Sequence, residues 1–418
     1  MTPDSSGASA TGVNGTRTLP VPTGSELEAT EAALSYLGSA LPTSGPDRAV
    51  AVSGSALRTS GPDRAVAVSG SALRTSGPDR AVADTALVTV IDTWGSAPVP
   101  IGGQMAVAQD GRFAGSVSGG CIEADIMVAA GKSMTDGKHR VVSFGVTDET
   151  AWRAGLPCGG NIRVLIEPLT ADTDRAVLER LAAAARTRET LIAVTDLGTG
   201  ARRIVERDGI VAIVATVLGR QPDAPEVRDL AHRLAGGDSR LVATPDGEVF
   251  FRTFAPPARL VIIGATHIAQ ALVALAHIAG YRAIVVDPRE AYATQNRFRG
   301  DRFGSVDIIA DSPAEALDRI GIDAFTAVIA LAHVIHIDDE ALKAALRGNA
   351  RYIGVLGSRR NRDRRRDRLR AEGFSDGEIE RIRSPIGLDI GALTPAEIAV
   401  AILAEVIETV RGKRRPDL

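Results

Sequence analysis

Residues 259–290 read RLVIIGATHIAQALVALAHIAGYRAIVVDPRE, and their pattern of apolar residues determines the architecture of the C-terminal part. An apolar run leads into a glycine turn, and the turn leads into a segment with apolar residues at helical spacing. A second apolar run follows and ends at Asp287. This order of strand, turn, helix and strand predicts a β-α-β unit with parallel strands.

The rest of the C-terminal part repeats this alternation. Strands are predicted within DAFTAVIALAHVI (323–335) and ARYIGVLGS (350–358), and each precedes a helical segment. TPAEIAVAILAEVIETVRG (394–412) has the pattern of a capped amphipathic helix. We therefore expect an α/β protein whose residues 258–418 form a Rossmann-like, doubly wound parallel sheet.

A different pattern precedes the APPAR segment at 255–259. Strand-like runs joined by turns, with a few helices, predict a mixed α+β domain over residues 84–255. Asp110-Gly111 marks a hairpin turn, and the apolar run after Gly209 continues the series of strands. Ser25 is placed to cap a helix within residues 23–42, and the Ser-, Gly- and Thr-rich residues 1–22 predict a disordered tail.

Residues 43–83 contain an internal repeat. TSGPDRAVAVSGSALR occupies 43–58, recurs unchanged at 59–74 and begins again at 75–83. The unit has almost no bulky apolar residue and is interrupted by Ser-Gly and Gly-Pro, so it cannot bury a face of its own. We interpret this segment as a solvated linker.

Composition restricts the function classes. A formal net charge of −3 argues against a chain that seeks nucleic acid, and no apolar run is long enough to span a bilayer. The N-terminus has no apolar segment typical of a secretory signal. We expect a cytoplasmic protein with no membrane and no nucleic-acid partner, whose two cysteines stay reduced.

Both cysteines touch a Gly-Gly pair. Cys121 follows Gly119 and Gly120 in SGGCIE, and Cys158 precedes Gly159 and Gly160 in PCGG. Glycine permits turns whose N–H groups converge on an anion, and a thiol beside such a nest is a candidate ligand or nucleophile. Two small buried residues beside ordinary turns are the simpler interpretation. Glu123 is either an acid/base or, more simply, a cap at the start of a helix.

The turn GATHIA at 264–269 keeps only the first glycine of the dinucleotide fingerprint. Thr266 holds the second position and Ala269 the third, while Asp287, 23 residues past Gly264, is placed to contact a ribose hydroxyl. The fold prediction survives these departures from the fingerprint, whereas NAD(P) binding does not follow from this turn alone.

Further candidates lie at the carboxyl edge of the predicted sheet. Eight arginines between 359 and 370 predict a solvated helix face, with Asp363 and Asp367 as partners. Ser358 and Arg359, where this helix begins, are candidate phosphate contacts. His267, in the glycine turn, and His333 and His336, after a strand, lie where such folds bind ligands.

These motifs, in this order, resemble the XdhC/CoxI family, the accessory proteins that mature xanthine dehydrogenase-like molybdenum hydroxylases. The N-terminal part matches through TWGSAP, GGQM, DGRFAGSVSGGCIEADI, FGVTDE and GLPCGG. The C-terminal part matches through VIIGATHIAQALVALA, VVDPR, YIGVLGSRRN and PIGLDIGALTPAEIAVAILAEVI. Two departures are Thr266 in place of the family's usual glycine, and LAHVIH where the family tends to have THD.

The resemblance implies a chaperone, rather than a catalyst, that binds the molybdenum cofactor (molybdopterin, in its mono- or dinucleotide form). Such a protein shields the cofactor while a cofactor sulfurase acts on it, delivers it to an apo molybdenum hydroxylase of the xanthine dehydrogenase family, and forms a homodimer. No catalytic residue and no metal ligand is assigned. The implied cofactor-binding residues are Gly119, Gly120, Cys121, Glu123, Cys158, Gly159, Gly160, Gly264, His267, Asp287, Arg289, Ser358 and Arg359.

Two other classes of protein remain as alternatives. The first is an NAD(P)-dependent oxidoreductase that uses the Rossmann-like domain. The second is a nucleic-acid binder that uses the arginine-rich helix.

Overall fold

The computed structural model describes residues 25–37, 83–94, 99–120, 122–145 and 161–411. They belong to two compact units, residues 24–257 and residues 258–418. The division falls after Pro257, inside the APPAR segment. The expected tail and the linker repeats, apart from Ala83, lie outside the described residues.

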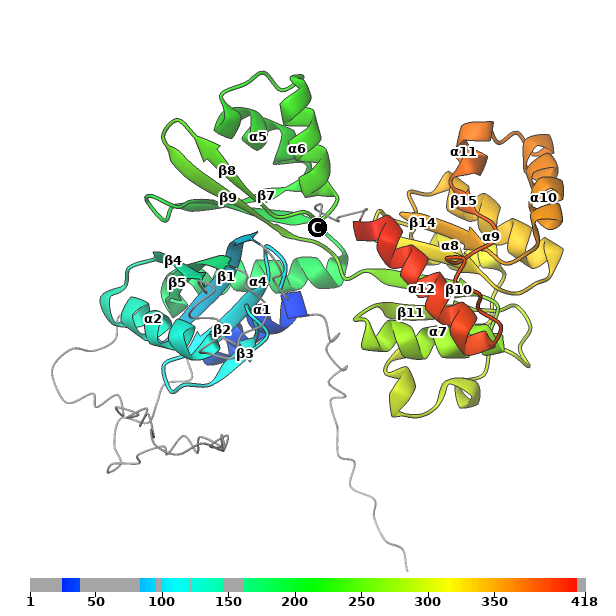
Figure 1. Ribbon diagram of the computed structural model, residues 1–418, viewed down its shortest axis with the longest axis horizontal. Helices are drawn as coiled ribbons and strands as arrows, with labels where there is room; N and C mark the ends of the chain where they lie inside the picture. The colour runs from blue at the N-terminus through cyan, green and yellow to red at the C-terminus, as the bar shows by residue number, and fades with distance from the viewer. Residues whose placement is uncertain (1–24, 38–82, 95–98, 121, 146–160, 412–418) are drawn as a thin grey trace, which may run out of the picture. The chain divides into compact units, whose positions relative to one another are not determined.

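The N-terminal unit contains two antiparallel sheets (Figure 1). The five-stranded sheet has the order β3-β2-β1-β5-β4, and the hairpin predicted at Asp110-Gly111 joins β2 to β3. Its elements are α1 (Ser25–Tyr36), β1 (Thr85–Trp94), β2 (Gln104–Ala108), β3 (Phe113–Gly115), α2 (Glu123–Asp136), β4 (Arg140–Gly145), β5 (Asn161–Leu169) and α4 (Ala171–Thr187).

Alternation along the strands explains how this sheet is covered. Val88 and Val90 of β1 belong to a core with Ile126 of α2, whereas Leu87 belongs to a core with Ala33 of α1. Since neighbouring residues of a strand point to opposite faces, α2 covers one face, and α1 with α4 covers the other. The helix predicted within 23–42 is therefore part of the core of this unit.

The second sheet has the order β7-β6-β9-β8 and is covered by α5 and α6. The prediction of a strand after Gly209 was wrong, because Ile210–Leu218 is helix α5. The apolar run extends to Leu218, longer than a short strand, and one side of it (Ile210, Val214) packs against Phe251 of β9. The elements are β6 (Leu191–Asp196), β7 (Arg202–Glu206), η1 (Arg207–Gly209), α5, α6 (Pro225–Ala235), β8 (Arg240–Thr244) and β9 (Gly247–Phe254).

The C-terminal unit confirms the predicted Rossmann-like fold. Six parallel strands have the order β12-β11-β10-β13-β14-β15. The elements are β10 (Arg259–Ile263), α7 (His267–Ile278), β11 (Arg282–Val286), η2 (Gln295–Phe298), η3 (Asp301–Phe303), β12 (Val306–Ile309), α8 (Pro313–Ile320), β13 (Thr326–Ala330), α9 (Ile335–Arg347), β14 (Tyr352–Val355), α10 (Arg359–Ala371), α11 (Asp376–Glu380), β15 (Ile382–Arg383) and α12 (Pro395–Arg411).

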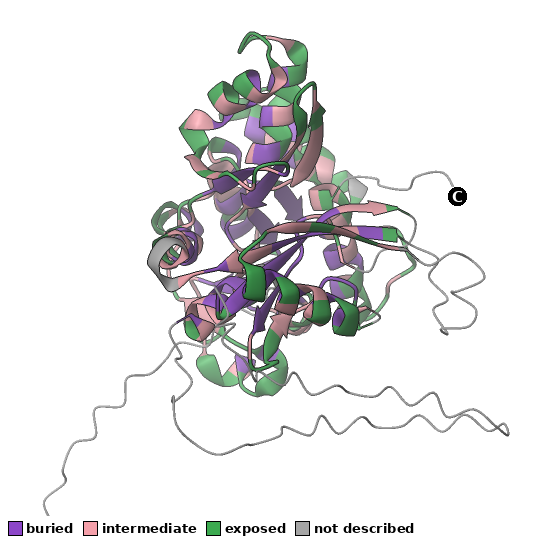
Figure 2. Ribbon diagram, turned by 90° about the vertical axis from the view of Figure 1, so that its left-hand side faces the viewer, coloured by how far each residue is buried: buried purple, intermediate pink, exposed green. Residues whose placement is uncertain are grey.

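Both faces of this sheet are buried, and its strands are correspondingly apolar. Figure 2 shows by colour which described residues are buried and which are exposed. Leu260 and Ile262 face a core formed with α7 and α12, which lie side by side. Val261 and Ile263 face a core formed with α8 and α9. From β10 the chain continues to β11 and β12 on one side, and it then returns to β13 on the other side of β10. The strand order therefore reverses between β10 and β13. Ligands bind at such a reversal, outside the carboxyl ends of the strands.

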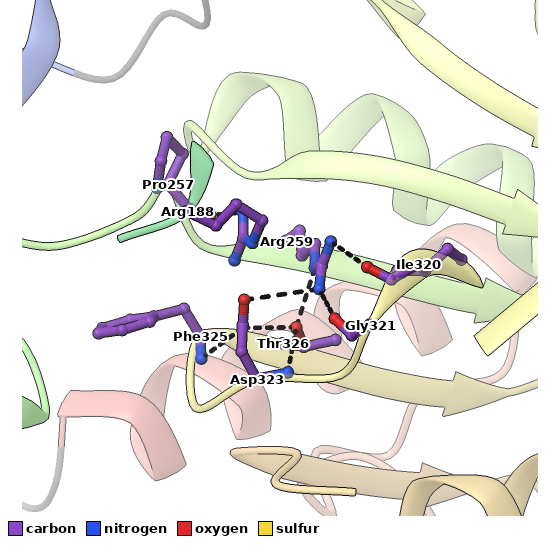
Figure 3. A network of polar contacts seen from close by, with 8 residues as sticks. All are labelled: Arg188, Pro257, Arg259, Ile320, Gly321, Asp323, Phe325 and Thr326. Atoms are coloured by element: carbon purple, nitrogen blue, oxygen red, sulfur yellow. Dashed lines mark hydrogen bonds and ion pairs between the residues drawn. The ribbon is translucent and has the colours of Figure 1, made fainter. Parts of the chain in front are cut away.

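A buried arginine ties the opposite end of these two strands together (Figure 3). The Nε of Arg259 donates to Oγ1 of Thr326 at 2.9 Å, and its guanidinium also contacts backbone oxygens of Ile320 and Gly321. Arg259 is 5% exposed and lies at the amino end of β10. We assign this network to stability rather than to ligand binding.

Candidate functional site

The glycine-rich loop between β3 and α2 has a backbone that requires glycine. Gly119 and Gly120 have φ values of +79° and +111°, in the region that side chains disfavour. Both residues are exposed, and a Cβ built on Gly120 meets no atom within 4 Å. The two glycines are therefore needed for the turn and leave its outer surface open to close approach.

The inner side of this loop surrounds the carboxylate of Glu123. Its Oε1 accepts from Oγ of Ser116 at 2.8 Å and from N of Ser118 at 3.1 Å, and its Oε2 accepts from the hydroxyl of Ser118. The N–H groups of Gly120 (3.0 Å) and Ile122 (3.2 Å) also donate to Oε2. The N–H groups of this loop do converge on an anion, and this anion is a side chain of the protein itself.

These hydrogen bonds explain the charge state of Glu123. Burial alone would raise the pKa of this carboxyl, but the bonds from Ser118, Ser116 and the backbone outweigh it and lower the pKa to about 2. At neutral pH a carboxyl with so low a pKa has no proton to donate, and as a base it is weak because both of its oxygens already accept hydrogen bonds. The first of the two predicted roles, an acid/base, is therefore disfavoured, and Glu123 organises the start of α2.

The residues expected beside this loop lie mostly outside the described ranges. Cys121, Cys158, Gly159 and Gly160 are not among the described residues. Gly120 and Ile122, which flank Cys121 in the sequence, are both held by Glu123. The assignment of Cys121 and Cys158 to cofactor binding stays a prediction.

In the C-terminal unit the reversal of strand order falls at Gly264. Its φ is +99°, and a Cβ built there would lie 2.5 Å from the backbone N and Cα of Ala332. The turns after β10 and β13 are thus in contact, and any residue other than glycine would separate them. Thr266 caps α7, because its Oγ1 accepts from N of Ala269 at 3.3 Å, which gives a structural reason for threonine at the second position.

Asp287 lies under this turn and is fully buried. Its Oδ2 accepts from N of Ala265 at 2.8 Å and from Nη2 of Arg289 at 2.7 Å, and its Oδ1 accepts from Nε of Arg289 at 2.8 Å. Burial raises the pKa of Asp287, but these bonds outweigh it and lower the value. Asp287 and Arg289, both candidate cofactor contacts, pair with each other, and both carboxylate oxygens are already engaged.

Two features at the end of β13 were not predicted: the backbone conformation of His333 and the burial of Asp338. His333 is exposed and has φ +58°, a rare conformation for a residue with a side chain. Asp338 of α9 is 2% exposed, and its Oδ1 accepts from N of Ala332 at 3.2 Å. Burial is the main reason that the pKa of Asp338 rises to about 6. Nothing in the run DDE at 338–340 indicates which acidic residue turns inward.

The remaining predicted residues lie around the same edge of the sheet. His267 is exposed at the first turn of α7, and His336 is exposed on α9. Ser358 caps α10, since its Oγ accepts from N of Asn361 at 3.3 Å. Arg359 begins α10, and its side chain is not described.

Neither a membrane span nor a metal cluster is found in the described part of the chain. None of its helices is long and apolar enough to cross a bilayer. No three His, Cys, Asp or Glu side chains within the described ranges are grouped as they would be around a metal ion.

Sequence comparison defines the class of protein. The XdhC Rossmann domain matches residues 260–406, which is the parallel-sheet unit. The XdhC and CoxI family matches residues 79–145, which include the loop closed by Glu123.

Individual relatives are similar over most of the chain. The molybdenum cofactor insertion chaperone PaoD of Escherichia coli is 30% identical over 77% of this chain and 81% of its own length. A probable xanthine dehydrogenase subunit from Bacillus subtilis is 27% identical over 78% of this chain and 93% of its own. The chain belongs to the XdhC and CoxI family, which confirms the resemblance seen in the sequence.

A solved structure supports the fold. The crystal structure of a xanthine dehydrogenase from Bacillus halodurans matches with a TM-score of 0.59 and 25% identity. The match covers 82% of this chain and 95% of that one.

Proposed function

We propose that this protein is a maturation chaperone that binds the molybdenum cofactor and delivers it to an apo molybdenum hydroxylase of the xanthine dehydrogenase family. The observation that carries the proposal is the similarity to PaoD, a molybdenum cofactor insertion chaperone, over both units of the chain. Its partners would be that hydroxylase, a cofactor sulfurase and a second copy of the chain, in the cytoplasm.

The loop closed by Glu123 fits such a ligand in one respect and restricts it in another. The exposed, side-chain-free surface at Gly119 and Gly120 lets a flat organic ligand approach the backbone. The inner amides already hold a carboxylate, so they would not take the phosphate of the cofactor as well. We therefore assign the loop to positioning: Glu123 holds the backbone on both sides of Cys121.

The thiols would supply the contacts that select the ligand. Sulfur is a soft donor suited to a molybdenum-dithiolene group, and Cys121 and Cys158 are the only cysteines of the chain. Gly159 and Gly160 would allow close approach beside Cys158, as Gly119 and Gly120 do beside Cys121. The bound cofactor supplies the redox centre that the client enzyme uses, and the chaperone holds and protects it.

In the C-terminal unit we assign a supporting role to the reversal of strand order. Gly264 and His267 would contact the phosphate or nucleotide part of the cofactor, together with Ser358 and Arg359 across the sheet edge. Asp287 and Arg289 would keep the turn in shape, because their charges neutralise each other there.

The proposal is tested by the ligand that the full chain retains. The protein is expressed in a host that makes the cofactor, purified and denatured, and the released ligand is identified by mass spectrometry. We expect molybdopterin, with a lower pterin-to-protein ratio in Cys121→Ala and in Cys158→Ala and an unchanged ratio in Asp125→Asn, an exposed control on α2. Absence of pterin, or equal retention in all four proteins, would refute the proposal.

The alternative of an NAD(P)-dependent oxidoreductase is favoured by the parallel sheet alone. The carboxylate that would bind a ribose is fully buried and already paired with Arg289. Protection against thermal unfolding by millimolar NAD(H) would support this alternative, and no shift would remove it.

A further inference from the structure

A cavity of about 290 Å³ lies at the edge of the parallel sheet, beside β15. It is lined by one face of α10, by α11, by β15 and the two residues after it, and by one residue of α12. All of these belong to the C-terminal unit. The cavity is separate from the turn at Gly264, which follows β10 in the middle of the sheet.

The lining of this cavity carries an excess of positive charge. Four arginines (Arg362, Arg365, Arg366 and Arg383) face two glutamates (Glu380 and Glu405). Glu405 is already engaged, because its Oε2 accepts from the hydroxyl of Tyr352 at 2.5 Å and from N of Gly387 at 2.7 Å. Glu380 makes one loose contact, 3.8 Å from Nη2 of Arg366.

The prediction of a solvated arginine-rich face on α10 was wrong for one side of the helix. Arg365 is 6% exposed, and its Nε donates to Oδ1 of Asp339 on α9 at 3.2 Å. Asp339 also binds Arg368 at 2.6 Å, so this carboxylate is shared between two guanidinium groups. The fold has therefore turned one arginine of the run inward at the cost of its hydration.

Two residues of the lining each have a buried polar atom with no hydrogen-bond partner among the described residues. These atoms are Nη1 of Arg365 and Oγ of Ser384. Buried donors are nearly always satisfied, and one on a charged group is expensive to leave unpaired. Two such donors beside one cationic cavity suit an acceptor that carries negative charge.

We propose that this cavity binds the phosphate or diphosphate group of a small molecule. A guanidinium and a hydroxyl are the donors that phosphate oxygens accept from, and the volume is at the lower limit of small-molecule sites. Leu369 and Ile379 add apolar surface to the lining, which suits an organic group attached to the phosphate. This site is additional to the proposed cofactor chaperone function and does not depend on it.

The test is calorimetric titration of the full chain with pyrophosphate, inorganic phosphate and AMP at constant ionic strength. We expect saturable binding of at least one of them. Arg365→Met should weaken it about tenfold or more, the loss expected for one charge-assisted hydrogen bond. Ser384→Ala should weaken binding as well, yet raise the thermal midpoint of the protein alone, because a buried hydroxyl without a partner is removed.

Arg364→Gln is the matched control, since Arg364 is exposed on the same helix and does not line the cavity. Its binding should equal that of the unchanged protein. Tighter binding of AMP than of phosphate would identify an organic phosphate as the ligand, and equal binding would identify the phosphate group alone. No saturable binding of any of the three, or equal weakening by Arg364→Gln, would overturn the proposal.

Discussion

The carboxylate of Glu123 should be a main source of stability in the N-terminal unit, and Glu123→Gln measures it. The pKa falls from the ordinary 4.5 to about 2. At about 1.4 kcal/mol per pKa unit this difference corresponds to an upper limit of about 3 kcal/mol. Solvent at the edge of the loop screens part of it, so we expect the substitution to cost about 2 kcal/mol.

The assay exploits where the tryptophans are. Trp94 and Trp152 are the only tryptophans of the chain, and both lie in the sequence of the N-terminal unit. Urea unfolding followed by tryptophan fluorescence therefore reports on that unit. Asp125→Asn is the control, because it removes the same charge from the first turn of α2 at an exposed position, where about 0.5 kcal/mol is expected.

The pH dependence gives the sharper test. A carboxyl whose pKa is lowered by folding stabilises the protein above its unfolded pKa and loses this effect as the pH falls toward the folded value. The difference between the unchanged protein and Glu123→Gln should be constant above about pH 5 and shrink between about pH 4.5 and 2. Equal costs for Glu123→Gln and Asp125→Asn, or a difference that does not change with pH, would refute the assigned role of Glu123.

Three further predictions concern the stability of the C-terminal unit. Its unfolding is measured by calorimetry, and tryptophan fluorescence, which reports on the N-terminal unit, should stay unchanged. Gly264→Ala should destabilise it by about 2 kcal/mol or more, since the new Cβ meets Ala332 at 2.5 Å; an unchanged midpoint would contradict this contact. Asp338→Asn should stabilise the unit by about 2 kcal/mol at about pH 7.5 and have little effect below about pH 4. Burial raises the pKa of Asp338 to about 6, so the ionised side chain destabilises the folded unit above that pH. Destabilisation by Asp338→Asn at the higher pH would contradict this. Arg289→Gln should lower the free energy of unfolding by about 3 kcal/mol, because it leaves the buried Asp287 without its arginine partner. Adding Asp287→Asn should restore part of this stability, and simple additivity of the two substitutions would contradict the pairing.

Local sequence patterns were enough to predict much of the fold. They failed where contacts between residues far apart in the sequence determine the structure. The apolar run of β10 and the helical spacing in α7 predicted the parallel sheet, because each signal lies within one element. The apolar run after Gly209 suits either a strand or a buried helix, and only its packing on β9 distinguishes the two. Packing likewise decides that Arg365, among eight arginines, turns inward toward Asp339.

The candidate site shows the same limit. Two glycines before Cys121 correctly indicated a turn that side chains disfavour. The hydrogen bond from N of Ala265 in the glycine turn to Asp287 was not predicted, and the contact of Asp287 with a ribose hydroxyl stays a prediction. That Glu123 would fill the amide nest was not predicted, because it requires the chain to fold back from α2 onto Ser116 and Ser118. The buried position of Asp338 depends on contact with the end of β13 and has no local signal.

Transfer of the cofactor is the most direct measurement of the proposed function. The full chain, purified with its retained ligand, is mixed with an apo molybdenum hydroxylase of the xanthine dehydrogenase family, and the two proteins are separated again. We predict that pterin moves to the hydroxylase and that hydroxylase activity appears in proportion to it. Pterin that stays on this chain while the hydroxylase remains inactive, or a purified chain that carries no pterin at all, would contradict the proposed function.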